Sequence, residues 1–361
     1  MSASNVSDKT EHGRFFEDFR LGETLHHATP RTLTEGDQAL YIALTGSRFA
    51  LHSADTFAQD LGLPGAPIDD LLVFHMVLGK TVPDVSLNAV ANLGYAGCVF
   101  GALVYPGDTL SARSQVIGLK ENSSRKTGVV TVRTTGINQD DEMVIDYIRW
   151  VMVNKRDPAV PAPTPETPDL PESVAAADLV VPAGLDLSKY DCALAGSPHL
   201  WDDYTVGERI DHVDGLTIEE AEHQMATRLY QNTAKVHFNQ QAAAAGRFGR
   251  RIVYGGHVIS LARALSFNGL GNGFRLAAIN GGRHVAPCFA SDTVYAWSEV
   301  CDKIALPGRT DVGALRLRTL AVKGRPTGGF PETGPASGDA SGKPDAALIL
   351  DLDYMVLMPR R

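Results

Sequence analysis

The residues of this chain that could carry acid–base chemistry lie close together, between positions 228 and 260. His237 has an imidazole side chain, whose reference pKa near neutrality suits a general acid or base. Asn232, five residues earlier, offers a hydrogen-bond donor and an acceptor, so it could orient a water molecule or a carbonyl group. Gly255 and Gly256 precede an apolar segment, and a backbone N–H at such a turn suits a developing oxyanion. On residue types alone, His237 could instead form only local hydrogen bonds, and the glycines could simply make the turn.

The second half of the chain repeats the first half at a fixed spacing. The run Phe16 to Phe19 returns 185 residues later as Trp201 to Tyr204, and the same offset relates His52 to His237 without a gap. A repeat of about 150 residues is too long for a solenoid unit and indicates a duplicated domain. The copy around His52 has Ser47 at the position of Asn232 and lacks the glycine pair, so we predict that its site is degenerate.

Two irregular stretches separate the regular segments. Residues 156–182 are dense in proline, alanine and acidic residues, a composition typical of an extended linker. Residues 323–346 are rich in glycine, proline and serine and interrupt only the second copy. We therefore predict a first repeat over residues 1–155, a linker over 156–195 and a second, catalytic repeat over 196–361.

Each copy has the pattern of one buried helix followed by an antiparallel sheet. Ile68 to Leu78 and His257 to Leu265 are apolar on nearly every face, which predicts helices that are buried all round. β-rich runs follow the first helix, at Thr109 to Val116, Val129 to Thr134 and Val144 to Val153. A sheet wrapped around one central helix is a hot-dog arrangement. The prediction is an α+β double hot-dog fold, with the two sheets joined edge to edge.

Capping-box spacing marks a possible helix start in each copy. Thr32 with Glu35 and Thr217 with Glu220 both have this spacing, although Thr34 with Asp37 could serve in the first copy.

Composition excludes several classes of protein. The chain has 361 residues, 44% of them hydrophobic, which is enough for two cores. Its net charge of −9 argues against nucleic-acid binding. No apolar run is long enough for a signal sequence or a membrane span, so we expect a cytoplasmic protein. The four cysteines lack metal-binding or pairing patterns, which predicts reduced thiols and no metal site.

The segment from Arg228 to Ser260 resembles the signature of the MaoC-like, (R)-specific enoyl-CoA hydratase family. That signature has an aspartate five residues before a histidine, then a phenylalanine-glycine step and a glycine turn into the buried helix. His237, Phe248-Gly249 and Gly255 match it, and Ser260 matches a serine often present on the helix. The resemblance covers residues 16–153 and 201–358 and implies the same double hot-dog fold.

The departure from this signature is Asn232, which stands at the aspartate position. An amide cannot accept a proton as a general base, so the roles that the family assigns to its aspartate and histidine cannot both apply to Asn232 and His237. The resemblance implies that His237 transfers the proton, that Asn232 orients the reacting water and that Gly255 stabilises the enolate oxygen.

Within the family the chain most resembles the mesaconyl-CoA (2-methylfumaryl-CoA) hydratases. This resemblance rests on Asn92 to Gly97, Thr227 to Thr233, Gly249 to Gly256 and Tyr354 to Arg360. It implies reversible hydration of mesaconyl-CoA to β-methylmalyl-CoA, with CoA as part of the substrate and no separate cofactor. A homodimer without nucleic-acid or membrane partners is also implied. Because this substrate carries its own carboxylate, a fixed aspartate at position 232 could be redundant or repulsive.

A CoA thioester brings several phosphate charges to this acidic chain, so a local basic patch is expected. Arg247, Arg250 and Arg251 could supply it, although a solvated basic edge fits these residues equally well. Further candidates for substrate contacts are Gly256, Ser260, and Arg228 or Arg283 for the carboxylate.

Three rival functions remain open at this stage. The first is a hydratase of simpler enoyl-CoA esters on the same scaffold. The second is a hot-dog thioesterase, which would release free CoA, whereas a hydratase leaves the thioester intact. The third is a non-catalytic acyl-CoA-binding protein, which would be indifferent to substitution of His237.

Overall fold

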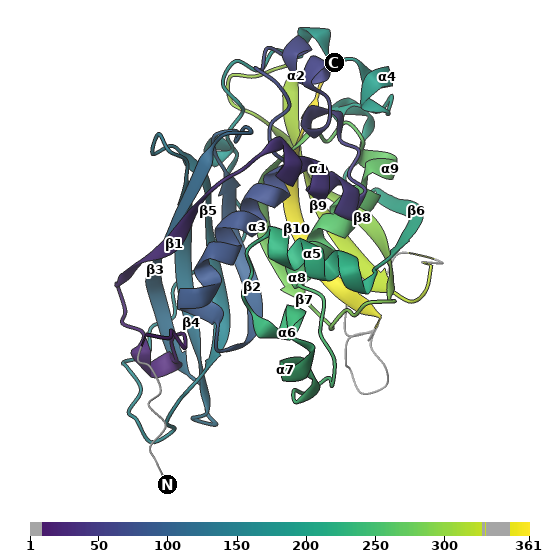
Figure 1. Cartoon of the computed structure of the whole chain (residues 1–361). Helices are drawn as coiled ribbons and strands as arrows, with labels where there is room; N and C mark the ends of the chain where they lie inside the picture. The colour runs from purple at the N-terminus through teal and green to yellow at the C-terminus, as the bar shows by residue number, and fades with distance from the viewer. Residues whose placement is uncertain (1–8, 327–328, 330–346) are drawn as a thin grey trace.

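The computed structural model describes residues 9–326, 329 and 347–361. Its main feature is one antiparallel sheet with the strand order β1-β3-β4-β5-β2-β7-β10-β9-β8-β6, which curves around two central helices (Figure 1). The strands of the first copy are β1 (Thr24–Thr32), β2 (Ala89–Phe100), β3 (Thr109–Glu121), β4 (Thr127–Ile137) and β5 (Met143–Asn154). Those of the second copy are β6 (Arg209–Thr217), β7 (Arg275–His284), β8 (Thr293–Ala305), β9 (Val312–Lys323) and β10 (Leu348–Pro359).

The helices lie in front of the sheet in Figure 1, with one long central helix for each copy. They are α1 (Glu35–Thr45), α2 (Asp55–Asp60), α3 (Asp70–Thr81), α4 (Cys192–Ala195), α5 (Glu220–Leu229), α6 (Lys235–Phe238), α7 (Gln240–Ala244), α8 (Gly255–Leu265) and α9 (Phe267–Leu270). Every residue of α3 is buried, and in α8 only Gly255 is not, which confirms the prediction from their nearly all-apolar character.

The two copies meet where β2 pairs with β7. Tyr95 lies opposite Gly282, and Val99 lies opposite Ala278. This pairing makes the five-stranded sheets continuous, so the double hot-dog arrangement and its edge-to-edge junction are confirmed. The predicted strands of the first copy are also confirmed as parts of β3, β4 and β5.

The predicted helix starts are wrong at two positions. Thr32 and Thr217 still belong to strands β1 and β6, where their hydroxyls hydrogen-bond to those of Thr109 and Thr293 at 2.7 Å in both copies. The cap of α1 is Thr34, whose side chain accepts from the backbone N–H of Asp37, as the alternative reading had it. In the second copy α5 begins without a side-chain cap.

Within the predicted linker, residues 156–182 contain one 3-10 turn, Ala176–Asp178, and pack against the sheet. The linker forms an isolated bridge between Glu166 and Leu119 of β3. Farther along, the backbone N–H of Val174 donates to the Asn280 side chain of β7 at 2.9 Å. The linker therefore travels from the first copy to the second along the sheet. Most of the predicted irregular stretch 323–346 lies outside the described residues.

Two other predictions concern the cysteines and the possibility of a membrane span. The four cysteines form no disulfide, and Cys98 and Cys288 are buried. Across residues 9–326, 329 and 347–361, no helix combines the length and apolarity needed to cross a bilayer.

Candidate active site

His237 lies on the short helix α6, close to the start of α8. Its Nδ1 is 3.0 Å from the carbonyl oxygen of Ile252. Because a carbonyl can only accept, Nδ1 carries the hydrogen and Nε2 presents a lone pair. Burial lowers the pKa of His237 to about 4, so the ring is neutral near pH 7. A neutral imidazole with a fixed Nδ1–H is suited to accept a proton at Nε2.

The first copy has the same hydrogen bond at the equivalent positions. His52 Nδ1 is 3.2 Å from the carbonyl oxygen of Pro67, and both residues precede their counterparts by 185 positions. The duplication has therefore kept the geometry that orients this imidazole in both copies.

Gly255 is the first residue of α8 and lies directly beneath the ring of His284. A Cβ at this position would lie 2.5 Å from His284 Cε1, so only glycine allows this approach. Gly256 is covered in the same way by the ring of Tyr254. Within the described chain, the N–H groups of both glycines have no acceptor, as expected for the first turn of a helix. These donors can stabilise negative charge on an oxygen.

His284 is a site residue that sequence reasoning missed. Its pKa is lowered to about 4, chiefly by burial and secondarily by His237, so its ring is neutral near pH 7. Its Nε2 is 3.3 Å from the hydroxyl of Tyr95, which comes from β2 of the first copy. No spacing rule links positions 95 and 284, because Tyr95 and His284 meet only through the pairing of β2 with β7.

Asn232 lies in the buried loop between α5 and α6. Its Oδ1 accepts the N–H of Ala234 at 3.0 Å, which leaves the Nδ2 donor without a partner within the described chain. The preceding residue, Gln231, has a positive φ of 53°. Lys80 of α3 donates to the Gln231 side chain at 3.3 Å, and burial lowers the pKa of Lys80 to about 8. The first copy thus helps to hold the loop that carries Asn232.

The remaining predicted residues lie elsewhere. Ser260 is buried and bonds to the Tyr41 hydroxyl at 2.9 Å and to His75 Nε2 at 2.8 Å, between the two central helices. Arg283 is exposed and pairs with Asp351. The three clustered arginines are engaged locally: Arg247 stacks over Phe248, Arg250 over Phe289, and Arg251 pairs with Glu220. The structure therefore brings His237, Gly255 and Gly256 into one site and leaves these arginines around its outer side.

The equivalent site of the first copy is filled by charged side chains. Asp70 stands at the start of α3, where α8 has Gly255. Its carboxylate lies 3.7 Å from His52 Nε2 and 3.5 Å from Arg275 Nε, and it accepts the N–H of Leu276. A carboxylate repels an oxyanion at the same helix terminus. The first copy thus retains the histidine. The negatively charged Asp70, however, occupies the helix terminus at which an oxyanion would bind.

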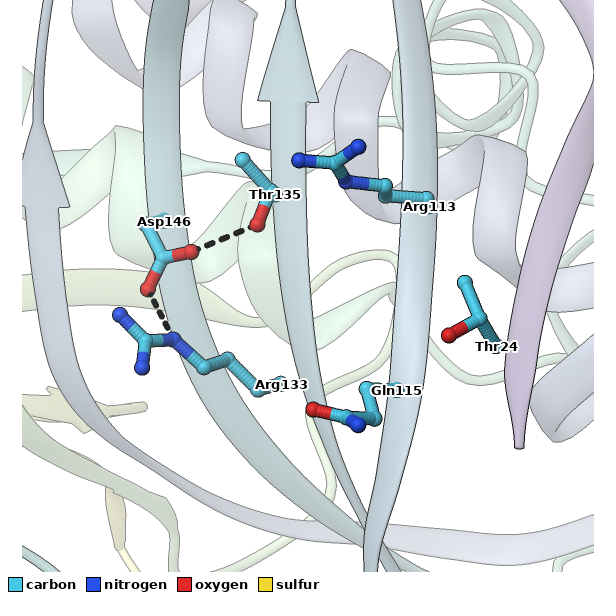
Figure 2. Close-up of a pocket in the computed structure, with 6 residues that line it drawn as sticks. All are labelled: Thr24, Arg113, Gln115, Arg133, Thr135 and Asp146. Carbon is cyan, nitrogen blue, oxygen red and sulfur yellow. Dashed lines mark hydrogen bonds and ion pairs between the residues drawn. The ribbon is translucent and has the colours of Figure 1, made fainter. Parts of the chain in front are cut away.

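A shallow hollow on the outer side of the first sheet is separate from this site. Figure 2 shows it lined by Arg113, Arg133 and Asp146 together with Thr24, Gln115 and Thr135. Val132 and Thr134 alternate with two of these residues along β4 and are buried on the helix side. The hollow therefore faces away from α3 and from His237.

A continuous double hot-dog sheet, with a histidine beside a glycine helix terminus in one copy and beside an aspartate in the other, places this protein among the MaoC-like double hot-dog dehydratases. The chain belongs more narrowly to the mesaconyl-CoA hydratase family, whose model matches residues 1–330. It is 66% identical to the β-methylmalyl-CoA dehydratase of Chloroflexus aurantiacus, over 99% of this chain and 100% of that protein. It is 59% identical to the mesaconyl-CoA hydratase of Cereibacter sphaeroides, over 98% and 100%.

Solved structures agree with this assignment. A MaoC domain protein dehydratase from Chloroflexus aurantiacus superposes with a TM-score of 0.94 at 66% identity, covering 98% of this chain and 100% of that one. A double hot-dog protein from Mycobacterium tuberculosis superposes with a TM-score of 0.75 at 27% identity, over 96% and 98%.

Proposed function

We propose that this protein is a hydro-lyase that reversibly adds water to mesaconyl-CoA and forms β-methylmalyl-CoA. Two relatives that match along their whole length carry these activities in their names. The structural observation that carries the proposal is the neutral His237 beside the unpartnered N–H groups at the start of α8. That pair supplies the base and the oxyanion donors that hydration of an enoyl thioester needs.

In the proposed reaction, water adds to C3 of the enoyl group. His237 Nε2 accepts a proton from the water while the water oxygen bonds to C3. The electrons of the double bond move toward the thioester oxygen, where the N–H groups of Gly255 and Gly256 stabilise the enolate. As the enolate collapses, C2 takes the proton that His237 accepted, which restores both the thioester and the neutral imidazole. Asn232 orients the water through its Nδ2 donor, a role in which no proton leaves the amide.

The proposal also assigns the other predicted contacts. Arg247, Arg250 and Arg251 follow α7 at the outer side of the site, where they could meet the phosphates of CoA. CoA enters as part of the substrate, and the reaction needs no separate cofactor. A cytoplasmic homodimer remains the expected state.

The direct test compares two substrates. Mesaconyl-CoA and crotonyl-CoA are mixed separately with the protein while the enoyl-thioester absorbance and free CoA are followed. Faster hydration of mesaconyl-CoA without release of CoA is the expected result. A preference for crotonyl-CoA would indicate a hydratase of simpler esters, and free CoA would indicate a thioesterase. Binding without turnover would leave only an acyl-CoA-binding protein.

Asn232→Asp is expected to weaken the reaction of the dicarboxylic substrate. Aspartate keeps the acceptor used by Ala234 but replaces the Nδ2 donor with a buried negative charge. Repulsion between this charge and the substrate carboxylate should raise KM for mesaconyl-CoA about tenfold, with a smaller effect on crotonyl-CoA. Steady-state kinetics with both substrates measure this difference.

Asn239→Asp is the matched control for this variant. Asn239 is exposed and caps α7 through the same kind of side-chain acceptor, so KM should change less than about twofold. Unchanged rate and affinity of Asn232→Asp for mesaconyl-CoA would rule out the charge argument.

The low pKa of His237 predicts an unusual pH profile. The neutral form is the active base, and a pKa lowered to about 4 keeps it neutral as the pH falls well below the ordinary value of 6.5. The rate constant kcat should therefore stay nearly constant from about pH 8 to about pH 5.5 and fall only at lower pH. A profile of kcat that loses half its value near pH 6.5 would contradict this assignment.

A further inference from the structure

Arg149 is a buried cation without a counter-ion. It lies on β5 with 1% of its surface exposed, and no carboxylate in the described part of the chain is within ion-pair distance of it. Its Nη2 donates to the Thr81 hydroxyl at 2.6 Å, and Nη1 is 3.5 Å from the Ser86 hydroxyl. Its Nε is buried and has no partner. Burying a guanidinium without an anion costs several kcal/mol, so its retention calls for a reason.

The position of Arg149 connects it to the active site. It lies directly opposite Tyr95 in the pairing of β5 with β2, and Tyr95 lies opposite Gly282 of β7. Side chains at opposite positions of antiparallel strands are neighbours on one face. The Tyr95 hydroxyl in turn contacts His284, whose ring covers Gly255. Arg149 is therefore one strand away from the residues that surround the oxyanion donors.

Tyr254 provides a second connection between Arg149 and the site. Its ring lies 5.6 Å from the ring of His237 between centroids, and its buried hydroxyl has no hydrogen-bond partner. Its ring also lies 5.6 Å from that of His75 on α3, the helix whose Thr81 accepts a hydrogen bond from Arg149. Burial raises the pKa of the Tyr254 hydroxyl, so it stays a neutral donor.

A third unpartnered group lies on the same face. Both polar atoms of the Asn92 side chain are buried without a partner. Asn92 on β2 is opposite Val151, which is two residues beyond Arg149 on β5 and therefore on the same face of the sheet. Within the described chain, three buried donors thus have no partner: Arg149 Nε and Asn92 Nδ2 from the first copy, and the Tyr254 hydroxyl from the second. A buried carboxylate requires a cation and several hydrogen-bond donors around it.

We propose that Arg149, assisted by Asn92 and Tyr254, binds the free carboxylate of the dicarboxylic substrate. This inference rests on the proposed function, because only such a substrate carries this group. The carboxylate of mesaconyl-CoA is attached to C3, the carbon that receives water. A cation that binds this carboxylate should therefore lie near His237. Arg283, the candidate from sequence, is exposed and already paired with Asp351. The first copy, whose own site is filled, would thereby supply the specificity of the second.

Arg149→Met tests this role through substrate preference. The substrates are mesaconyl-CoA and 2-methylcrotonyl-CoA, which has a methyl group in place of the carboxylate. Loss of the guanidinium should lower kcat/KM for mesaconyl-CoA about 100-fold and leave that for 2-methylcrotonyl-CoA unchanged or higher. Arg149→Lys should recover part of the loss, because it restores charge but not the planar fork.

Arg263→Met is the matched control. Arg263 is also a buried arginine, but it lies toward the other end of α8 and bonds to Gly273 and Ser266. This variant should lose stability without changing the preference between the substrates. A folded Arg149→Met that keeps the wild-type preference, or loses both substrates equally, would overturn the proposal.

A measurement on the wild type avoids any dependence on folding of the variants. Succinyl-CoA and butyryl-CoA are unreactive analogues that differ in having a carboxylate or a methyl group at the same end. Succinyl-CoA should bind at least about tenfold more tightly. Equal affinities would contradict the carboxylate site, whereas absence of mesaconyl-CoA turnover by the wild type would contradict the proposed function instead.

Discussion

Replacing His237 with glutamine is expected to lower kcat for mesaconyl-CoA about 1000-fold, because the amide cannot accept the proton of the attacking water. The other elements of the site remain: the N–H donors of Gly255 and Gly256 do not depend on this ring. KM should therefore change much less than kcat. Initial rates over a range of substrate concentrations measure both constants.

The chain contains a matched control for this variant. His52 has the same hydrogen bond to a backbone carbonyl, but it faces the carboxylate of Asp70 rather than a glycine terminus. His52→Gln should keep kcat within about threefold of the wild type, with rates expressed per folded protein. If His52→Gln abolished turnover and His237→Gln did not, the catalytic site would belong to the first copy.

Gly79→Ala is expected to damage both stability and catalysis. A Cβ at position 79 of α3 would lie 1.8 Å from the carbonyl oxygen of Tyr230, a backbone atom that cannot rotate away. To relieve this overlap, α3 must move away from the segment that continues into Asn232. We expect this to lower the free energy of unfolding by about 3 kcal/mol. A displacement of the loop by about 1 Å could lower kcat about 100-fold. Denaturant unfolding and initial rates test the two effects separately.

Gly36→Ala is the control for this substitution. Gly36 is an exposed residue in the first turn of α1, and a Cβ there would have only ordinary contact with Thr34 at 3.5 Å. Because alanine favours a helix, this variant should be as stable as the wild type or slightly more stable. Equal stability of Gly79→Ala and the wild type would show that α3 and the Asn232 loop are not held in contact.

The two copies differ at the first residue of their central helices. Both retain a histidine that donates to a carbonyl 15 residues later, but one helix begins with Asp70 and the other with Gly255. A carboxylate removes the oxyanion site and adds a buried ion pair with Arg275, which joins the two copies. We therefore propose that the first copy contributes structure around the active site rather than a second centre of reaction.

Local sequence determined the regular elements and the part of the site that lies on one segment. The nearly all-apolar runs predict α3 and α8, since a helix buried on all sides needs mostly apolar residues on every face. The spacing of Asn232, His237 and Gly255 follows from one chain segment that leads into α8. The constant offset of 185 residues marks the duplication, because gapless repetition is a property of the chain itself.

Tertiary structure alone decided which other residues join this site. Tyr95, Arg149 and His284 come from three strands and both copies, and they become neighbours only because β2 pairs with both β5 and β7. No local pattern distinguishes Arg149 from a surface arginine on an alternating strand. Its burial without an anion depends on the helix and strands packed around it. The same is true of Gly79, whose need for glycine arises from the distant carbonyl of Tyr230.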